Sequence, residues 1–169
     1  DEVWSFLPPA VEGGRREPSV HTATYVPPAQ LRAGLSEKHL KRLQNWPRLI
    51  EVRNEVLKAL ENARREKFIG SPLEAKVRLA TQTELLPLLE EYRAMLPTLF
   101  IASQVEVGKD SLKDAYESQI PGLSVGIEKA SGQKCERCWN YSEHVGEDQR
   151  YPTACERCST ALREIEATA

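Results

Sequence analysis

Residues 132–165 read GQKCERCWNYSEHVGEDQRYPTACERCSTALREI, and all four cysteines of the 169-residue chain lie in this stretch. They form two Cys-x-x-Cys pairs with sixteen residues between the pairs. A two-residue gap lets two thiolates converge on one ion, and two such knuckles complete a closed tetrahedral site of four sulfurs, which zinc usually occupies. We therefore expect one structural Zn²⁺ held by Cys135, Cys138, Cys155 and Cys158.

Three other interpretations of the cysteines stay open at this point. Two disulfides would suit a secreted protein, a thioredoxin-like pair should open a helix after a strand, and an iron–sulfur cluster uses the same ligands. A closed four-sulfur site has no open position for a substrate, so we expect the metal to hold shape. Zinc binding of about 10–16 kcal/mol would supply the folding energy of this module, because about thirty residues cannot build a sufficient core.

The composition is that of a globular protein, with 40% hydrophobic and 28% charged residues. No apolar run approaches the ~18–20 residues of a membrane span, and no signal peptide opens the sequence. We therefore expect a cytoplasmic, monomeric protein without a membrane partner. The net charge of −2 argues against indiscriminate coating of nucleic acid. Because the first residue is Asp1 rather than Met, we expect a fragment of a longer polypeptide.

The pattern predicts an α+β fold in three parts: a helical region over 1–70, a small α/β junction unit over 71–130 and a zinc ribbon over 131–169. Five of the eleven prolines and three of the nine glycines fall in residues 1–35, which we expect to be mostly loop after a helix ended by Pro8-Pro9. A long helix follows over 36–67, ended by Gly70, with a kink or a restart at Pro47. Its predicted buried stripe consists of Leu40, Leu43, Trp46, Leu49, Ile50, Val52, Val56, Leu60 and Ala63.

The middle part predicts a roughly three-stranded sheet. Alternating or β-branched runs favour strands over 75–79, 99–107 and 123–129, and a helix is expected over 84–96. In the last part, a short helix over 159–167 should follow the second cysteine pair.

Positive charge gathers in the first half of the chain. Between residues 36 and 78, eleven Lys and Arg face six Glu, which fits either a solvated helix face or a partner rich in phosphate. No Walker loop, nucleophile elbow or dinucleotide fingerprint occurs in the sequence. We therefore expect these residues to serve recognition rather than turnover.

Two blocks of the sequence resemble bacterial-type isoleucyl-tRNA synthetase. The first resembles the anticodon-binding helical domain of that family, and the second resembles the zinc finger that closes the family's C-terminus. The first block reads Trp46-x-x-Leu49-x-x-Val52-Arg53-x-x-Val56 and runs on to Lys67-x-Ile69-Gly70; the second reads Lys134-Cys135-x-Arg137-Cys138-Trp139, followed by Cys155-x-Arg157-Cys158.

The resemblance implies a parent enzyme that attaches isoleucine to tRNA(Ile) with ATP and Mg²⁺, in a catalytic domain accompanied by an editing domain. The His-Ile-Gly-His-like and Lys-Met-Ser-Lys-Ser-like signatures of the catalytic domain are absent here. This part of the enzyme is therefore expected to lack catalytic activity and to grip the anticodon side of the tRNA. The residues expected to contact tRNA are Lys134, Arg137, Trp139, Arg150, Arg53, Arg64 and Lys67.

Within that set, Trp139 is the candidate for stacking on an unpaired base, and the alternative is that it packs the ribbon onto the α/β unit. Two rival functions also stay open. The finger resembles that of formamidopyrimidine-type DNA glycosylases, where Gln149-Arg150 would touch DNA, although their N-terminal proline and helix-two-turn-helix are absent. The ribbon can also be a purely structural module.

Overall fold

The computed structural model describes residues 1–7 and 16–168, which form two compact units, Asp1–Gln44 and Asn45–Ala169. The helix end expected at Pro8-Pro9 lies outside the described residues. Among the residues described, no helix is both long and apolar enough to cross a membrane. The predicted division into three domains stays a prediction.

In the described residues of the first unit, three short helices precede the long one. They are α1 (Glu2–Phe6), the 3-10 helix η1 (Val20–Thr22) and α2 (Pro28–Arg32), and none of them has a buried residue. The Asp1 carboxylate accepts hydrogen bonds from the Ser19 hydroxyl at 2.8 Å and the Val20 amide at 3.1 Å. These local contacts, rather than a core, order the segment that the proline content predicted as mostly loop.

The long helix α3 runs from Glu37 to Arg65, with Pro47 inside it, so the helix does not restart at the proline. The predicted bounds of 36–67 lie within two residues of these, but Gly70 was wrongly assigned as the residue that ends the helix. Lys67 takes the left-handed conformation (φ 59°), and the Phe68 amide donates to the Ala63 carbonyl at 2.9 Å. This bond between residues five apart is the usual way of closing a helix with a left-handed residue.

The predicted buried stripe of α3 is correct only in its C-terminal part. The buried apolar residues of the helix are Leu49, Val52, Val56, Ala59, Leu60 and Ala63. By contrast, the side chains of Leu40, Leu43, Trp46 and Ile50 are 39–43% exposed. A helical period shows which residues share a face, but tertiary packing decides how far along the helix that face is covered.

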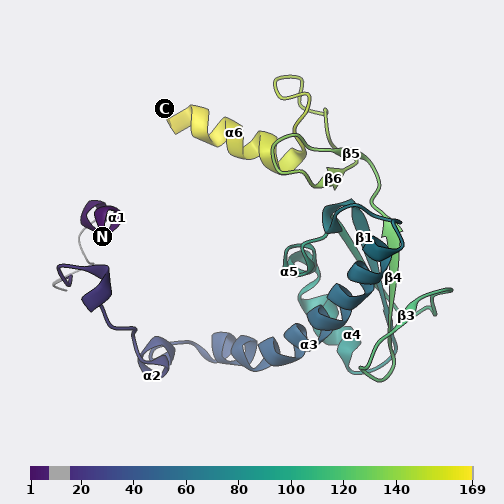
Figure 1. Cartoon of the computed structure of the whole chain (residues 1–169), viewed down its shortest axis with the longest axis horizontal. Helices are drawn as coiled ribbons and strands as arrows, with labels where there is room; N and C mark the ends of the chain where they lie inside the picture. The colour runs from purple at the N-terminus through teal and green to yellow at the C-terminus, as the bar shows by residue number, and fades with distance from the viewer. Residues whose placement is uncertain (8–15, 169) are drawn as a thin grey trace. The chain divides into compact units, whose positions relative to one another are not determined.

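The sheet has four strands in the order β2-β1-β4-β3. Three are the predicted ones, β1 (Ala75–Thr81), β2 (Gln104–Gly108) and β4 (Leu123–Lys129), and the fourth is the two-residue β3 (Tyr116–Glu117). β1 pairs in parallel with β2 and antiparallel with β4, and β4 pairs antiparallel with β3. Figure 1 shows α3 alongside this sheet.

The connection from β1 to β2 is more helical than predicted. It contains α4 (Leu85–Glu91), the 3-10 helix η3 (Arg93–Met95) and α5 (Leu96–Phe100). The strand predicted over 99–107 is therefore wrong in its first half. Pro97 occupies the first turn of α5, and Ile101 ends that helix in the left-handed conformation (φ 58°), so the strand begins only at Gln104.

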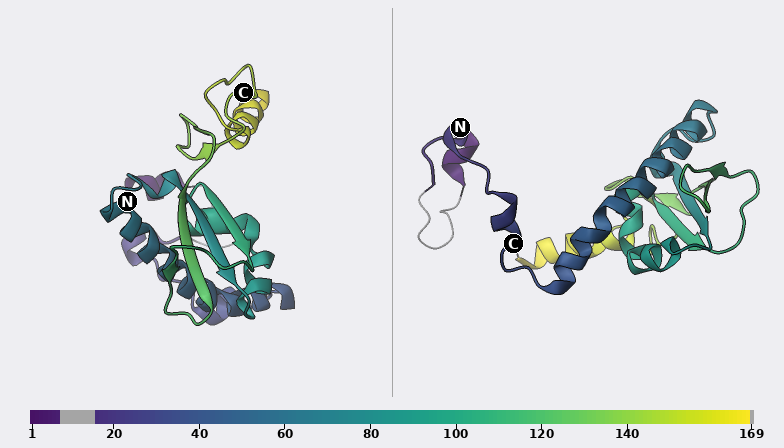
Figure 2. Two further views of the ribbon diagram at one scale, coloured as in Figure 1. Left: turned by 90° about the vertical axis from the view of Figure 1, so that its right-hand side faces the viewer. Right: turned by 90° about the horizontal axis from the view of Figure 1, so that it is seen from below.

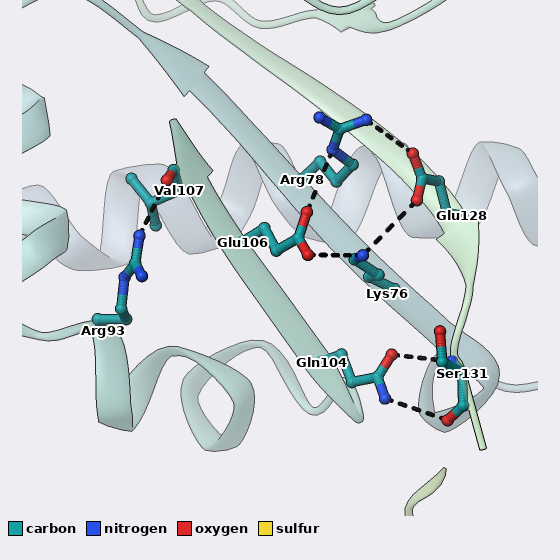
Figure 3. Close-up of polar contacts among 8 residues, drawn as sticks. All are labelled: Lys76, Arg78, Arg93, Gln104, Glu106, Val107, Glu128 and Ser131. Atoms are coloured by element: carbon teal, nitrogen blue, oxygen red, sulfur yellow. Dashed lines mark hydrogen bonds and ion pairs between the residues drawn. The ribbon is translucent and has the colours of Figure 1, made fainter. Parts of the chain in front are cut away.

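Alternation along the strands separates an apolar face from a charged one. Val77 and Val125 belong to a core shared with Val56 of α3 and Phe100 of α5. The opposite face carries an ion-pair network, which Figure 3 shows with α3 behind the strands. In it, the Lys76 ammonium lies 2.6 Å from Glu106 and 4.0 Å from Glu128, and the Arg78 guanidinium lies 3.4 Å from Glu106 and 3.0 Å from Glu128.

The C-terminal module follows β4 and consists of the hairpin β5 (Gln133–Lys134) and β6 (Tyr141–Ser142) and the helix α6 (Glu156–Thr168) (Figure 2). Ser103, directly before β2, joins it to the α/β unit. The Ser103 hydroxyl accepts from the Tyr141 amide at 2.8 Å and donates to the carbonyl of Leu73 in the 3-10 helix η2 (Pro72–Glu74). The side-chain amide of Gln104 donates a hydrogen bond to the Ser131 carbonyl and accepts one from the Ser131 backbone amide (Figure 3). β2 therefore anchors the module to the α/β unit.

Candidate metal centre and nucleic-acid interface

The four cysteine sulfurs converge at the base of the C-terminal module. All four Sγ atoms lie within 4.8 Å of one another, and those of Cys138 and Cys155 are 3.7 Å apart. Ligands about 2.3 Å from a tetrahedral zinc lie about 3.8 Å from each other, whereas sulfurs in a disulfide lie at about 2.05 Å. The cluster therefore has the spacing of a four-thiolate zinc site and not that of disulfides.

The backbone of the hairpin forms the first knuckle. The Trp139 amide donates to the Cys135 carbonyl at 2.8 Å, and the Cys135 amide donates to the Asn140 carbonyl at 2.9 Å. The second knuckle begins at Cys155 and passes into the first turn of α6, which contains Cys158. Cys135, Cys155 and Cys158 are buried and Cys138 is partly buried, so the site is closed to substrates.

The four thiols differ in how readily they ionise. Burial raises the pKa of the Cys138 thiol, but hydrogen bonds with the Asn140 amide and side chain, and with Cys135 and Cys158, together outweigh this and lower its pKa to about 6. At Cys155 burial prevails and raises the pKa of the thiol to about 12. A bound divalent zinc would deprotonate all four thiols and offset half of the resulting negative charge.

Gly132 is a residue of this module that the sequence analysis overlooked. It has φ +85°, and a Cβ atom there would lie 2.3 Å from the Ser142 carbonyl carbon and 2.5 Å from the Glu143 amide nitrogen. Only glycine combines this left-handed backbone with so close an approach of another chain segment. In the sequence, its position directly before the first hairpin strand could have indicated that this glycine is required.

Trp139 lies at the tip of the first knuckle with its side chain 61% exposed. Its backbone is left-handed (φ 65°), which is uncommon for a bulky residue. The Lys134 ammonium lies 5.7 Å from the centroid of the Trp139 ring. Together the two side chains present an aromatic face and a positive charge at one surface of the module.

Two other candidate RNA contacts in the module have partners within it. The Arg137 guanidinium donates from Nη1 to Cys158 Sγ at 3.7 Å. Arg150 pairs with Glu166 of α6 at 2.5 Å, and its guanidinium lies 5.8 Å from the Tyr151 ring.

The remaining candidates lie on or beside α3. Arg53 donates from Nε to the Leu99 carbonyl at 3.0 Å, and Arg64 forms two hydrogen bonds with Glu61 at 2.9 Å each. Lys67 is exposed and occupies the left-handed position that ends the helix. Arg53 is thus engaged inside the α/β unit, whereas Arg64 and Lys67 face solvent.

Comparison with known proteins supports a zinc site at the four cysteines. A family model described as "Zinc finger found in FPG and IleRS" matches residues 132–161. The chain is 40% identical over 164 residues to the isoleucine–tRNA ligase of Geobacter sulfurreducens, which covers 96% of this chain and 17% of that protein. It is 42% identical over 167 residues to the isoleucine–tRNA ligase of Syntrophotalea carbinolica. That match covers 97% of this chain and 17% of that protein.

The fold and the cysteine cluster thus define an α+β protein with a zinc-finger module. Over nearly its whole length the chain is similar to a part of isoleucine–tRNA ligases, which confirms the resemblance to isoleucyl-tRNA synthetase. It spans only 17% of the length of these curated relatives.

Proposed function

We propose that this chain is the tRNA-binding C-terminal part of an isoleucyl-tRNA synthetase, an isoleucine–tRNA ligase located in the cytoplasm and monomeric. The parent enzyme would charge tRNA(Ile) with isoleucine, using ATP and Mg²⁺ in a catalytic domain outside this chain, beside an editing domain. The observation that carries the proposal is the similarity to isoleucine–tRNA ligases over 96–97% of the chain.

Within that enzyme, the finger would bind the anticodon side of tRNA(Ile). Trp139 supports this, because an exposed indole on a rigid knuckle can stack on an unpaired base of a loop. Lys134 lies beside the same ring and can meet the neighbouring phosphate. Arg64 and Lys67 offer further exposed positive charge at the end of α3. The bound zinc would fix the geometry of the knuckle and take no part in chemistry.

Substitution of Trp139 by alanine tests this function. Stacking on an aromatic side chain contributes about 1–3 kcal/mol per base, so Trp139→Ala should weaken binding of a tRNA(Ile) anticodon stem-loop by about 5- to 150-fold. The measurement is fluorescence anisotropy of the labelled stem-loop with the zinc-loaded chain, at one fixed salt concentration.

The matched control is Trp139→Phe, which keeps an aromatic face and should stay within about threefold of the original affinity. Equal zinc content of all three proteins separates lost stacking from lost folding. Unchanged affinity of the alanine variant, with a lower melting temperature, would favour the purely structural role of the ribbon.

The same assay addresses the alternative of a formamidopyrimidine-type DNA glycosylase. This alternative stays open because the matching zinc-finger family is described as found in FPG as well as in IleRS. The chain should prefer the stem-loop to a duplex DNA that contains an oxidised purine. Tighter binding of the damaged duplex would overturn the proposed function.

A further inference from the structure

Phe68, just after α3, repeats the arrangement of an exposed aromatic ring beside a lysine that Trp139 has on the knuckle. The Phe68 side chain is 43% exposed, and the Lys129 ammonium lies 5.8 Å from the centroid of its ring. Trp139 is 61% exposed, with the Lys134 ammonium at 5.7 Å. In both pairs the cation lies within the distance of about 6 Å at which an aromatic ring attracts it.

The backbone after α3 holds Phe68 at the surface. The left-handed conformation of Lys67 turns the chain, and the Phe68 amide donates to the Ala63 carbonyl at 2.9 Å. The next residue, Ile69, is 2% exposed and belongs to the core of the α/β unit. Because its backbone is bonded to the helix and its neighbour is anchored in the core, Phe68 needs little further ordering to bind a partner.

The last residue of β4 brings a positive charge to this ring. Alternate residues of a strand share one face of the sheet, and in β4 the side chains of Leu123, Val125 and Ile127 pack in the core or against it. Lys129 comes next in this row and is exposed. The apolar face of the sheet therefore ends in a lysine beside Phe68.

The exposed charges next to Phe68 are mainly positive. Arg65 and Lys67 precede it in the chain and Lys129 contacts its ring, against the single carboxylate of Glu66. Every nucleobase has a face that can stack on an aromatic side chain, and lysine and arginine attract the phosphates of the same strand. This combination fits a single-stranded nucleic acid better than an apolar partner.

The two aromatic–lysine pairs are close enough in the chain to meet one RNA. Lys129 and Lys134 are five residues apart, so their Cα atoms are separated by at most about 18 Å. A strand stacked as in a duplex rises about 3.4 Å per nucleotide, and about five nucleotides cover that length. One stem-loop can therefore contact both lysines.

We propose that Phe68 and Lys129 form a second stacking site for single-stranded RNA, in addition to Trp139 and Lys134. An unpaired base stacks on the Phe68 ring, and the Lys129 ammonium meets a phosphate of the same strand. This site rests on the proposed function, because it adds a contact to the RNA that the knuckle would bind.

Replacement of Phe68 by leucine in the zinc-loaded chain tests the stacking. Leucine keeps an apolar side chain on the protein surface but offers no aromatic face. Phe68→Leu should therefore weaken binding of the tRNA(Ile) anticodon stem-loop by at least about fivefold, measured by fluorescence anisotropy. Phe68→Tyr is the matched control and should stay within about threefold of the original affinity. Unchanged binding by the leucine variant, or equal losses in both variants, would overturn the site.

The salt dependence of binding tests Lys129 with a readout that a purely structural role would not move. Loss of one phosphate contact to a single strand should reduce the slope of log affinity against log salt concentration by about 0.7 in Lys129→Gln. Lys113→Gln is the control, since Lys113 is an exposed lysine in the loop between β2 and β3, and its slope should not change. An unchanged slope in Lys129→Gln would refute the phosphate contact and with it the site.

A second probe, an oligouridylate of the same length as the stem-loop, separates this site from the proposed function. If binding of the stem-loop responds to Trp139→Ala but not to Phe68→Leu, the second stacking site is wrong and the proposed function stands. If the unsubstituted chain binds oligouridylate as tightly as the stem-loop and Phe68→Leu weakens both, the stacking site stands and recognition of tRNA(Ile) is wrong.

Discussion

At the scale of single residues, Glu55 shows how one buried carboxylate can tie a loop to a helix. It is 5% exposed within α3. Its oxygens accept hydrogen bonds from the Lys58 ammonium at 2.6 Å, the Gln119 amide at 2.8 Å and the Tyr116 hydroxyl at 3.1 Å. The Lys58 hydrogen bond contributes most to lowering the pKa of Glu55, followed by that of Gln119. All three donors favour the ionised form, so Glu55 stabilises the fold as a carboxylate.

The stability of the α/β unit should therefore depend on pH through Glu55. Because its pKa is lower in the folded than in the unfolded state, its contribution is fully present above the unfolded value near 4.5 and is lost as the pH falls through the folded value. Glu55→Gln should lower the free energy of unfolding by about 1–2 kcal/mol at pH 7. The difference from the unsubstituted chain should shrink below pH 4.5, as urea unfolding at several pH values would measure.

Glu51→Gln, at an exposed carboxylate paired with Arg48, is the control and should change stability by less than about 0.5 kcal/mol. A pH-independent difference for Glu55→Gln would contradict this account.

At the scale of elements, α3 has two parts that one apolar period does not distinguish. Leucines recur on both, but Leu60 is 3% exposed in the core of the α/β unit, whereas Leu43 is 39% exposed. The free energy gained by burying a side chain follows the area removed from water, so equal residues on one helix differ in their contribution.

Two leucine substitutions on this helix measure the difference. Leu60→Ala should destabilise the chain by about 2–5 kcal/mol, because it leaves a cavity in a packed core. Leu43→Ala removes the same atoms from an exposed site and should change stability by less than about 0.5 kcal/mol. Thermal unfolding followed by circular dichroism gives both values. Equal losses would show that the exposed stripe is covered in solution.

At the scale of the whole molecule, the second unit contains two separate apolar cores. The larger core joins α3, α4, α5 and the sheet. The smaller one consists of Cys135, Ala154, Cys155 and Cys158, with Cys138, Val145 and Tyr151 packed against it. So few apolar side chains cannot fold a module without further support, and a bound zinc would provide it.

Chelation should consequently unfold the C-terminal module first. On addition of EDTA, backbone amides over residues 131–165 should lose protection from hydrogen exchange, while those of β1, β4 and the buried part of α3 keep theirs. Hydrogen-exchange mass spectrometry resolves the two regions, and restored zinc should restore protection. Simultaneous loss in both regions, or no loss in either, would contradict a metal-dependent module on a metal-independent core.

Much of the site could be predicted because it depends on local chemistry. Two Cys-x-x-Cys pairs at this spacing favour a four-sulfur site, since the two-residue gap itself sets the reach of the thiolates. The strands β1 and β4 were predicted because alternation marks a sheet with one buried face. The apolar run 99–107 was assigned wrongly, because a short apolar run fits a buried helix end as well as a strand.

The sequence by itself determined the composition of the metal centre, the α+β class and the similarity to isoleucyl-tRNA synthetase, because spacing and alternation are properties of neighbouring residues. Only the tertiary structure decided where the apolar face of α3 ceases to be covered and that Trp139 stays exposed. It also decided that the Arg137 guanidinium reaches Cys158 of the opposite knuckle. These outcomes depend on which surfaces meet when segments distant in the chain pack together, and no local pattern encodes that meeting.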